Sequence, residues 1–271
     1  MRPAFFTTLL YMASVLAAPG ARYFHPVPRA SCGPQDRTES VQGETTLAER
    51  FAPGPPHAYY CNVELVGQFE GEGSSADMRA FGNCAYYSTG QISPSQTPKM
   101  QHPGVAVLDV SDPQHPRAAG YLDSPVMLGA FESLEVAPTQ PLLIASTEPD
   151  SFELYDLSID CRHPVLKSSV SFPGLFSHSG TFAPDGRTFY GAKQSPDPKV
   201  PPASAVFAID TSNASHPRLA ATWVPPKASW VPHGVGLSKD GMLAYGVRTP
   251  FFTSWVRCSG MTRTLHNSLS Q

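Results

Sequence analysis

The chain has 271 residues, of which only 15% are charged, and its formal net charge is −3. Its 29 prolines and 21 glycines interrupt the sequence every few residues, which leaves little room for long helices and favours short strands joined by turns. The lysines and arginines are scattered singly rather than clustered, which argues against nucleic acid as a partner.

Residues 1–18 have the layout of a secretory signal peptide. One positive charge at Arg2 precedes an apolar run of about 15 residues, and small residues follow up to Ala18. This run is too short to span a bilayer comfortably, and no other stretch is long enough for a membrane span. A buried N-terminal helix is the alternative. We expect export to a secreted, periplasmic or cell-surface location.

The chain contains five cysteines, and this odd number leaves at least one unpaired within the chain in an oxidising compartment. None has C-x-x-C spacing, so a zinc knuckle is not expected. Cys61 and Cys84, both beside strand-like runs, are expected to pair with each other or with Cys32. Asn213 begins an Asn-Ala-Ser sequence and is a candidate glycosylation site.

Strand-like patterns follow a proline-rich extended leader at residues 19–58, in which no hydrophobic period persists. Residues 63–69 alternate apolar and polar side chains, as a half-buried strand does. Residues 80–88 contain a Gly-Asn turn that leads into an aromatic strand. Residues 104–122 contain an apolar strand, a Ser-Asp-Pro turn and a returning strand.

The pattern of residues 104–122 recurs twice further along the chain. The three apolar strands end in Asp109, Asp156 and Asp210, and His-Pro follows each aspartate by six or seven residues. We expect these aspartates to accept hydrogen bonds from the amides of the following turn. A calcium-binding role is the alternative.

A second repeated pattern of strand, tight turn and strand lies between the successive aspartates. Its copies begin at Glu132, His178 and His233. Asp-Gly dipeptides mark the turns of two copies, at residues 185–186 and 240–241, where glycine supplies a positive φ.

Combined, the two patterns give four short antiparallel strands in each repeat of roughly 45–55 residues, which is typical of a propeller blade. The sequence therefore predicts an all-β fold, a β-propeller of four-stranded antiparallel blades at residues 59–247. About three blades are recognisable, and residues 63–88 are expected to supply part of a fourth. The competing fold is a β-sandwich, which would not need aspartate and His-Pro marks in phase.

Residues 104–116, with an apolar strand, Asp109 and a Ser-Asp-Pro turn, resemble the LVIVD repeat family. The repeats around Asp156 and Asp210 match that motif more loosely. The resemblance covers about residues 64–247 and implies a secreted or surface-attached bacterial β-propeller. Family members largely lack an assigned activity, so the resemblance implies a shape and a location rather than a reaction.

Residues 248–271 carry no blade motif and are expected to form an off-pattern C-terminal tail. Propellers usually close with at least four blades. Our hypothesis is that the tail is the truncated or frame-shifted end of a longer, incomplete propeller. An open stack of sheets would expose edge strands that are prone to pairing.

Glu132, His178 and His233 share one repeat position, at the entrance to the innermost strand, and are expected to converge near the mouth of the central channel. A carboxylate and two imidazoles are competent ligands for zinc or another divalent ion, the one cofactor that the sequence suggests. Two alternatives remain: a neutral histidine acting as a general base, or side chains that cap the backbone of their own blades.

The histidines of the His-Pro turns, His115, His163 and His216, are expected to be structural turn residues, too far apart to share an ion. The sequence contains no G-x-S-x-G, P-loop or H-E-x-x-H motif.

These patterns favour an exported LVIVD-repeat propeller that acts as a binding or interaction scaffold rather than an enzyme, with an unknown protein or small-molecule ligand. The first alternative is a metal-dependent, lactonase-like hydrolase that uses Glu132, His178 and His233. The second is an inactive fragment of a longer propeller protein.

Overall fold

The computed structural model describes residues 31–34, 61, 63–71, 77–89, 101–130, 132–194, 204–225, 231–248 and 252–256. The chain divides into two compact units, Met1–Leu65 and Val66–Gln271. The signal peptide predicted at residues 1–18 lies outside the described residues, as does most of the leader at residues 19–58. Among the described residues, no helix is long and apolar enough to cross a membrane.

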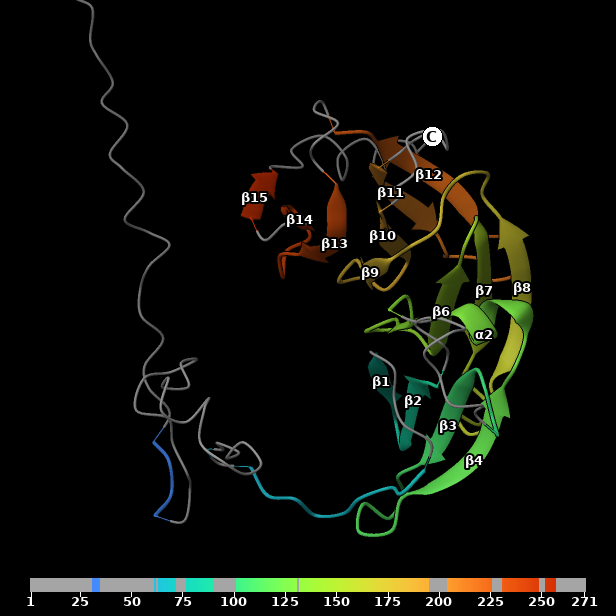
Figure 1. Cartoon of the computed structure of the whole chain (residues 1–271), viewed down its shortest axis with the longest axis vertical. Coiled ribbons are helices and arrows are strands. Elements are labelled where there is room, and N and C mark those ends of the chain that lie inside the picture. Colours follow the sequence, from blue (N-terminus) through green and yellow to red (C-terminus); the bar gives the residue numbers. More distant parts are fainter. Residues whose placement is uncertain are drawn as a thin grey trace, which may run out of the picture. The chain divides into compact units, whose positions relative to one another are not determined.

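The second unit is a β-propeller built from four antiparallel sheets, which follow one another in chain order (Figure 1). Blade 1 consists of β1 (Met78–Phe81), β2 (Cys84–Ser88), β3 (Val105–Asp109) and β4 (Arg117–Leu122). Blade 2 consists of β5 (Glu135–Val136), β6 (Leu142–Thr147), β7 (Ser151–Asp156) and β8 (Val165–Ser171). Blade 3 consists of β9 (Ser179–Phe182), β10 (Thr188–Gln194), β11 (Ser204–Asp210) and β12 (Arg218–Trp223). Blade 4 has three strands in the described part of the chain, β13 (Pro232–Leu237), β14 (Ala244–Arg248) and β15 (Phe252–Val256).

The order of strands within each blade confirms the sequence prediction. Each strand pairs with the next along the chain, so the first strand of a blade lies at one edge of its sheet. The third strands β3, β7 and β11 are buried along most of their length, whereas the fourth strands β4, β8 and β12 are exposed or partly buried. One short helix, α2 (Pro125–Gly129), joins blade 1 to blade 2.

Apolar side chains pack sheet against sheet, as the propeller architecture requires. One buried cluster joins blade 1 to blade 2, a second joins blade 2 to blade 3, and a third joins blade 3 to blade 4. Alternate residues of one strand serve different clusters, because successive side chains point to opposite faces: Leu143 packs toward blade 1 and Ile144 toward blade 3. Both faces of a middle blade are therefore buried, which explains its continuous apolar strands.

The aspartates that mark the repeat cap the turns after the third strands, as predicted. Asp109, Asp156 and Asp210 each accept a hydrogen bond from the backbone amide two residues later, at 2.8–2.9 Å. Asp109 also accepts one from Arg117 at 3.2 Å. Hydrogen bonds from Ser111, and to a smaller extent from Arg117, lower the pKa of Asp109 from 3.8 to about 2.

The blade with fewer than four described strands lies at a different place from the partial blade that was predicted. Residues 63–69 form no strand, and Val63 and Leu65 are 69% and 80% exposed. The alternation of apolar and polar side chains does not produce a strand there, because none of the described strands pairs with this segment. Phe69 nevertheless contacts Tyr87 of blade 1. Residues 80–88 belong to blade 1, which has four strands, whereas blade 4 has three strands among the described residues.

The limits of the blades also differ from the predicted residues 59–247. In the part of the chain that the structure describes, the first blade strand begins at Met78, and β15 ends at Val256, inside the tail that was expected to lie off the pattern. β15 pairs with β14 from Ala244↔Val256 to Arg248↔Phe252. The sequence did not predict this strand because no aspartate marks its end.

Two disulfides form, and one of them corrects the expected pairing. Cys32 pairs with Cys61 within the first unit, which was one of the expected alternatives. Cys84 pairs with Cys161 rather than with Cys61 or Cys32. Cys84 begins β2 of blade 1 and is buried in the cluster that joins blades 1 and 2, and Cys161, in the turn after β7 of blade 2, packs against this cluster. Packing between blades, not proximity in sequence, thus determines the partner. Cys258 lies outside the described residues.

Candidate functional site

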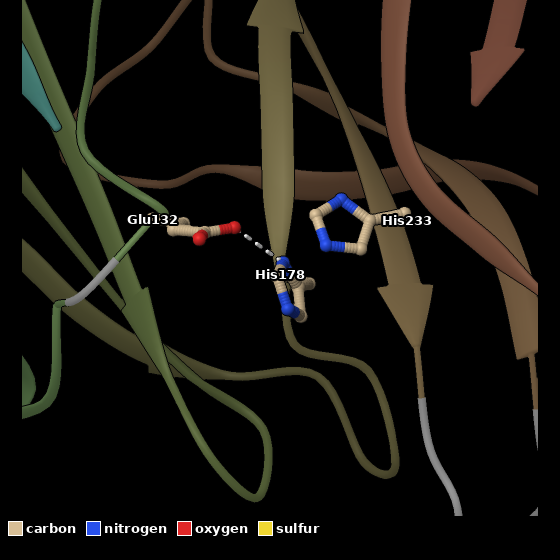
Figure 2. Close-up of side chains that lie close together, drawn as sticks. All are labelled: Glu132, His178 and His233. Atoms are coloured by element: carbon tan, nitrogen blue, oxygen red, sulfur yellow. Dashed lines mark ion pairs between the residues drawn. The ribbon is translucent and has the colours of Figure 1, made fainter. Parts of the chain in front are cut away.

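Glu132, His178 and His233 come together at one place in the propeller (Figure 2). Glu132 lies just before β5, His178 directly precedes β9, and His233 is the second residue of β13. The inner strands β5, β9 and β13 lie side by side, because β9 contacts both of the others. Their equivalent positions therefore converge, and one donor atom from each of the three side chains lies within 4.8 Å of the other two.

Glu132 and His178 form the closest pair in this cluster. The Nδ1 atom of His178 lies 3.1 Å from the Oε2 atom of Glu132. The side chain of His178 is 25% exposed and that of Glu132 is 31% exposed. The imidazoles of His178 and His233 have ring centroids 4.3 Å apart and are tilted by 49°. Solvent therefore reaches the cluster, although the polar groups face one another.

The Nδ1 atom of His178 is buried and makes no hydrogen bond, because its contact with Glu132 has the distance but not the alignment of one. This nitrogen therefore does not cap the backbone of blade 3. Buried polar atoms normally have a partner, so an unbonded imidazole nitrogen needs an explanation.

The surroundings of His178 favour a neutral ring. Burial is the largest effect and lowers the pKa of His178 below 6.5. The negative charge of Glu132 opposes this shift, and His233 adds to it. A neutral imidazole keeps a lone pair on one ring nitrogen, which is the form that binds a metal or accepts a proton.

Three buried serines connect the backbone segments that carry Glu132 and His178. The hydroxyl of Ser146 on β6 donates to the carbonyl oxygen of Ser177 at 2.9 Å and accepts from the amide of Ser177 at 3.0 Å. In the same way, Ser133 donates to the carbonyl oxygen of Ser146 at 2.5 Å and accepts from its amide at 3.3 Å. Since Ser133 follows Glu132 and Ser177 precedes His178, this serine clip holds both segments in one arrangement.

Sequence reasoning missed a second polar group near the cluster. Arg79 on β1 donates to Asp77 at 2.6 Å and to Glu135 at 2.5 Å. Burial is the largest effect on the pKa of Asp77 and raises it, and the nearby charge of Glu132 adds a smaller increase. Blade 1 thus also places charged side chains at its inner strand. The Gly82-Asn83 turn of this blade was recognised in the sequence, but its shorter length left the strand before it, with Arg79, unassigned.

The histidines of the His-Pro turns lie in exposed turns, as expected. The Nδ1 atom of His115 lies 2.9 Å from Asp112, and that of His163 lies 3.0 Å from Asp160. These imidazoles are 79% and 73% exposed. Asn213 is exposed in the third turn of this kind, where glycosylation stays a prediction.

No family model and no curated protein matches the chain. Among solved structures, the C-terminal WD40 domain of Sif2 aligns at 15% identity and a TM-score of 0.39, over 57% of this chain and 43% of that one. Sqt1 from Chaetomium thermophilum aligns at 12% identity and a TM-score of 0.46, over 72% of this chain and 47% of that one. The hydrazine synthase of Kuenenia stuttgartiensis aligns at 16% identity and a TM-score of 0.44, over 77% of this chain and 51% of that one. The chain spans about half the length of these structures, and its propeller architecture is established by the blades themselves.

Proposed function

We propose that this chain is an exported β-propeller of the LVIVD-repeat kind that binds a ligand at the inner strands of its blades. The observation that carries the proposal is the convergence of Glu132, His178 and His233 from three successive blades. Equivalent positions that carry different polar side chains are typical of a binding site placed on a repeating scaffold.

Export has two sources of support besides the signal-like residues 1–18. The two disulfides, Cys32–Cys61 and Cys84–Cys161, are the kind of cross-link that persists in oxidising compartments. The LVIVD-like motif also coincides with a strand, β3, and its capped turn. Intact-mass analysis of the mature chain from its native host tests export. A chain that begins after residue 18 and carries oxidised cysteines is expected, whereas a chain that keeps residues 1–18 and has free thiols would overturn it.

The same three side chains give a specific reason to consider a metal-dependent, lactonase-like hydrolase as the second candidate. Hydrolysis of a panel of lactones and aryl esters, with zinc or manganese added, separates the two candidates. If the chain is a binding scaffold, the wild-type protein is expected to hydrolyse these compounds no faster than the His178→Ala variant. Saturable, metal-dependent turnover that His178→Ala abolishes would replace binding by catalysis as the function.

A further inference from the structure

We infer that Glu132, His178 and His233 bind one divalent transition-metal ion of the zinc class and leave a coordination position open to a further ligand. This inference shares its three side chains with the proposed function but stands on geometry alone, and metal binding is measured independently of export or turnover. The metal would be the first chemically defined ligand of the scaffold.

The set of donors matches the chemistry of zinc. Two imidazoles and one carboxylate form a ligand set found at zinc sites that keep an open position, whereas structural zinc sites use four protein ligands. Around a tetrahedral ion with bonds of about 2.1 Å, ligand atoms lie about 3.4 Å apart. The Nδ1–Oε2 distance of 3.1 Å between His178 and Glu132 is already close to this value. No two of the three donor atoms lie more than 4.8 Å apart, so a closure of at most about 1.4 Å is required, which side-chain rotation can provide.

The unbonded nitrogen of His178 points to the same ligand. Its Nδ1 atom is buried, faces the carboxylate of Glu132, and has no hydrogen-bond partner (Figure 2). A metal ion between the carboxylate and the imidazole would satisfy this atom and compensate the charge of Glu132. Capping of the backbone would not use this nitrogen, whereas a metal ion would bind it directly.

The site is also held in place before any ligand arrives. Ser146 binds the amide and the carbonyl of Ser177, which directly precedes His178, and Ser133 binds the backbone of Ser146 in the same way. The serine clip therefore limits the relative motion of the segments that carry Glu132 and His178. The clip touches neither metal-binding side chain, so it acts on metal affinity through the backbone, and its loss should weaken binding less than the loss of a direct ligand.

Partial exposure indicates an open site rather than a sealed one. The side chains of Glu132 and His178 are 31% and 25% exposed, so water or an oxygen or nitrogen atom of another molecule can reach an ion held between them. The metal can then anchor a ligand of the scaffold at the inner strands.

Zinc titration of the full, tag-free chain, stripped of metal with EDTA and desalted, tests the inference. Isothermal titration calorimetry is expected to give one strong site for each chain. His178→Ala, His233→Ala and Glu132→Gln are each expected to weaken it by about 100-fold or more, since they remove direct ligands. His115→Ala, in an exposed turn, is the matched control and should leave the affinity unchanged.

Two further variants keep the test decisive if a ligand variant unfolds. Ser146→Ala retains all three metal ligands but breaks the serine clip, and a loss of about 10-fold in zinc affinity is expected. Ser177→Ala removes a buried hydroxyl without a hydrogen-bond partner and should change nothing. Absence of a strong site in the wild-type chain would overturn the inference, and so would full affinity in a folded His178→Ala variant. Neither result would bear on export or on the binding of other ligands.

Discussion

Replacing Ser146 by alanine tests whether the serine clip holds the candidate site together. The Ser146 hydroxyl makes two buried hydrogen bonds, to the amide and to the carbonyl of Ser177. Its removal takes a partner from both backbone groups, and each buried polar group left without a partner costs about 1–3 kcal/mol. We therefore predict that Ser146→Ala lowers the free energy of unfolding by about 2–6 kcal/mol. The bonds from Ser133 to Ser146 use only the backbone of Ser146 and are retained.

Ser177→Ala is the matched control for this prediction. Both serines are 2% exposed, but the Ser177 hydroxyl has no hydrogen-bond partner. Its removal should change the free energy of unfolding by less than about 0.5 kcal/mol or stabilise the protein slightly. Urea unfolding followed by circular dichroism measures both variants, with an unchanged m-value as the sign of an unchanged unfolding reaction. Equal losses in the two variants would refute the idea that the clip depends on the Ser146 hydroxyl.

Three further predictions concern the scaffold. The pKa of Asp109 is lowered from 3.8 to about 2 in the folded chain. The ionised carboxylate therefore contributes fully to the free energy of unfolding above pH 3.8, and this contribution is lost as the pH falls toward 2. Asp109→Asn should accordingly reduce the pH dependence of the urea midpoint in that range, and an unchanged slope would contradict this. Cys161→Ser removes the disulfide to Cys84, which closes a loop over a sequence separation of 77 residues. This change should lower the free energy of unfolding by about 4 kcal/mol. An unchanged free energy of unfolding would show that the disulfide does not stabilise the two blades. A Cβ atom at Gly180 would lie 2.4 Å from an aromatic ring and 2.6 Å from a backbone oxygen, so Gly180→Ala should lower the free energy of unfolding by about 1–3 kcal/mol. Gly236→Ala is the control, because no heavy atom lies within 4 Å of the added Cβ atom.

The sequence predicted the blades because its marks lie at points where the backbone needs particular residues. Asp109, Asp156 and Asp210 end the third strands of three blades, where each carboxylate accepts an amide of the turn. Gly186 and Gly241 have φ values of +69° and +68° in the turns between the first and second strands. Local chemistry of this kind repeats with the blade, so spacing alone reveals it.

The repeat also predicted which side chains of the candidate site would meet. Glu132, His178 and His233 share one position of the blade, and equivalent positions of neighbouring blades come close together at the inner strands. Whether they bind a ligand stays a prediction, because the same spacing would arise from residues that only cap the blades.

Features that depend on contacts between blades could not be read from the sequence. The partner of Cys84 lies on the next blade, and the hydroxyl of Ser146 reaches across to Ser177 of the following one. Neither residue stands at a marked position of the repeat. The contacts of Arg79 with Asp77 and Glu135 could not be predicted either, since Glu135 lies on the next blade.

Zinc-edge X-ray absorption of the zinc-loaded chain tests the central claim most directly, since it reports the atoms bound to the metal. A shell of nitrogen and oxygen atoms at about 2.0–2.1 Å is expected, with the scattering pattern of two imidazoles. That pattern should fall to one imidazole in His233→Ala. A sulfur shell at about 2.3 Å, or a spectrum that His178→Ala and His233→Ala leave unchanged, would show that the metal binds elsewhere and would contradict the account.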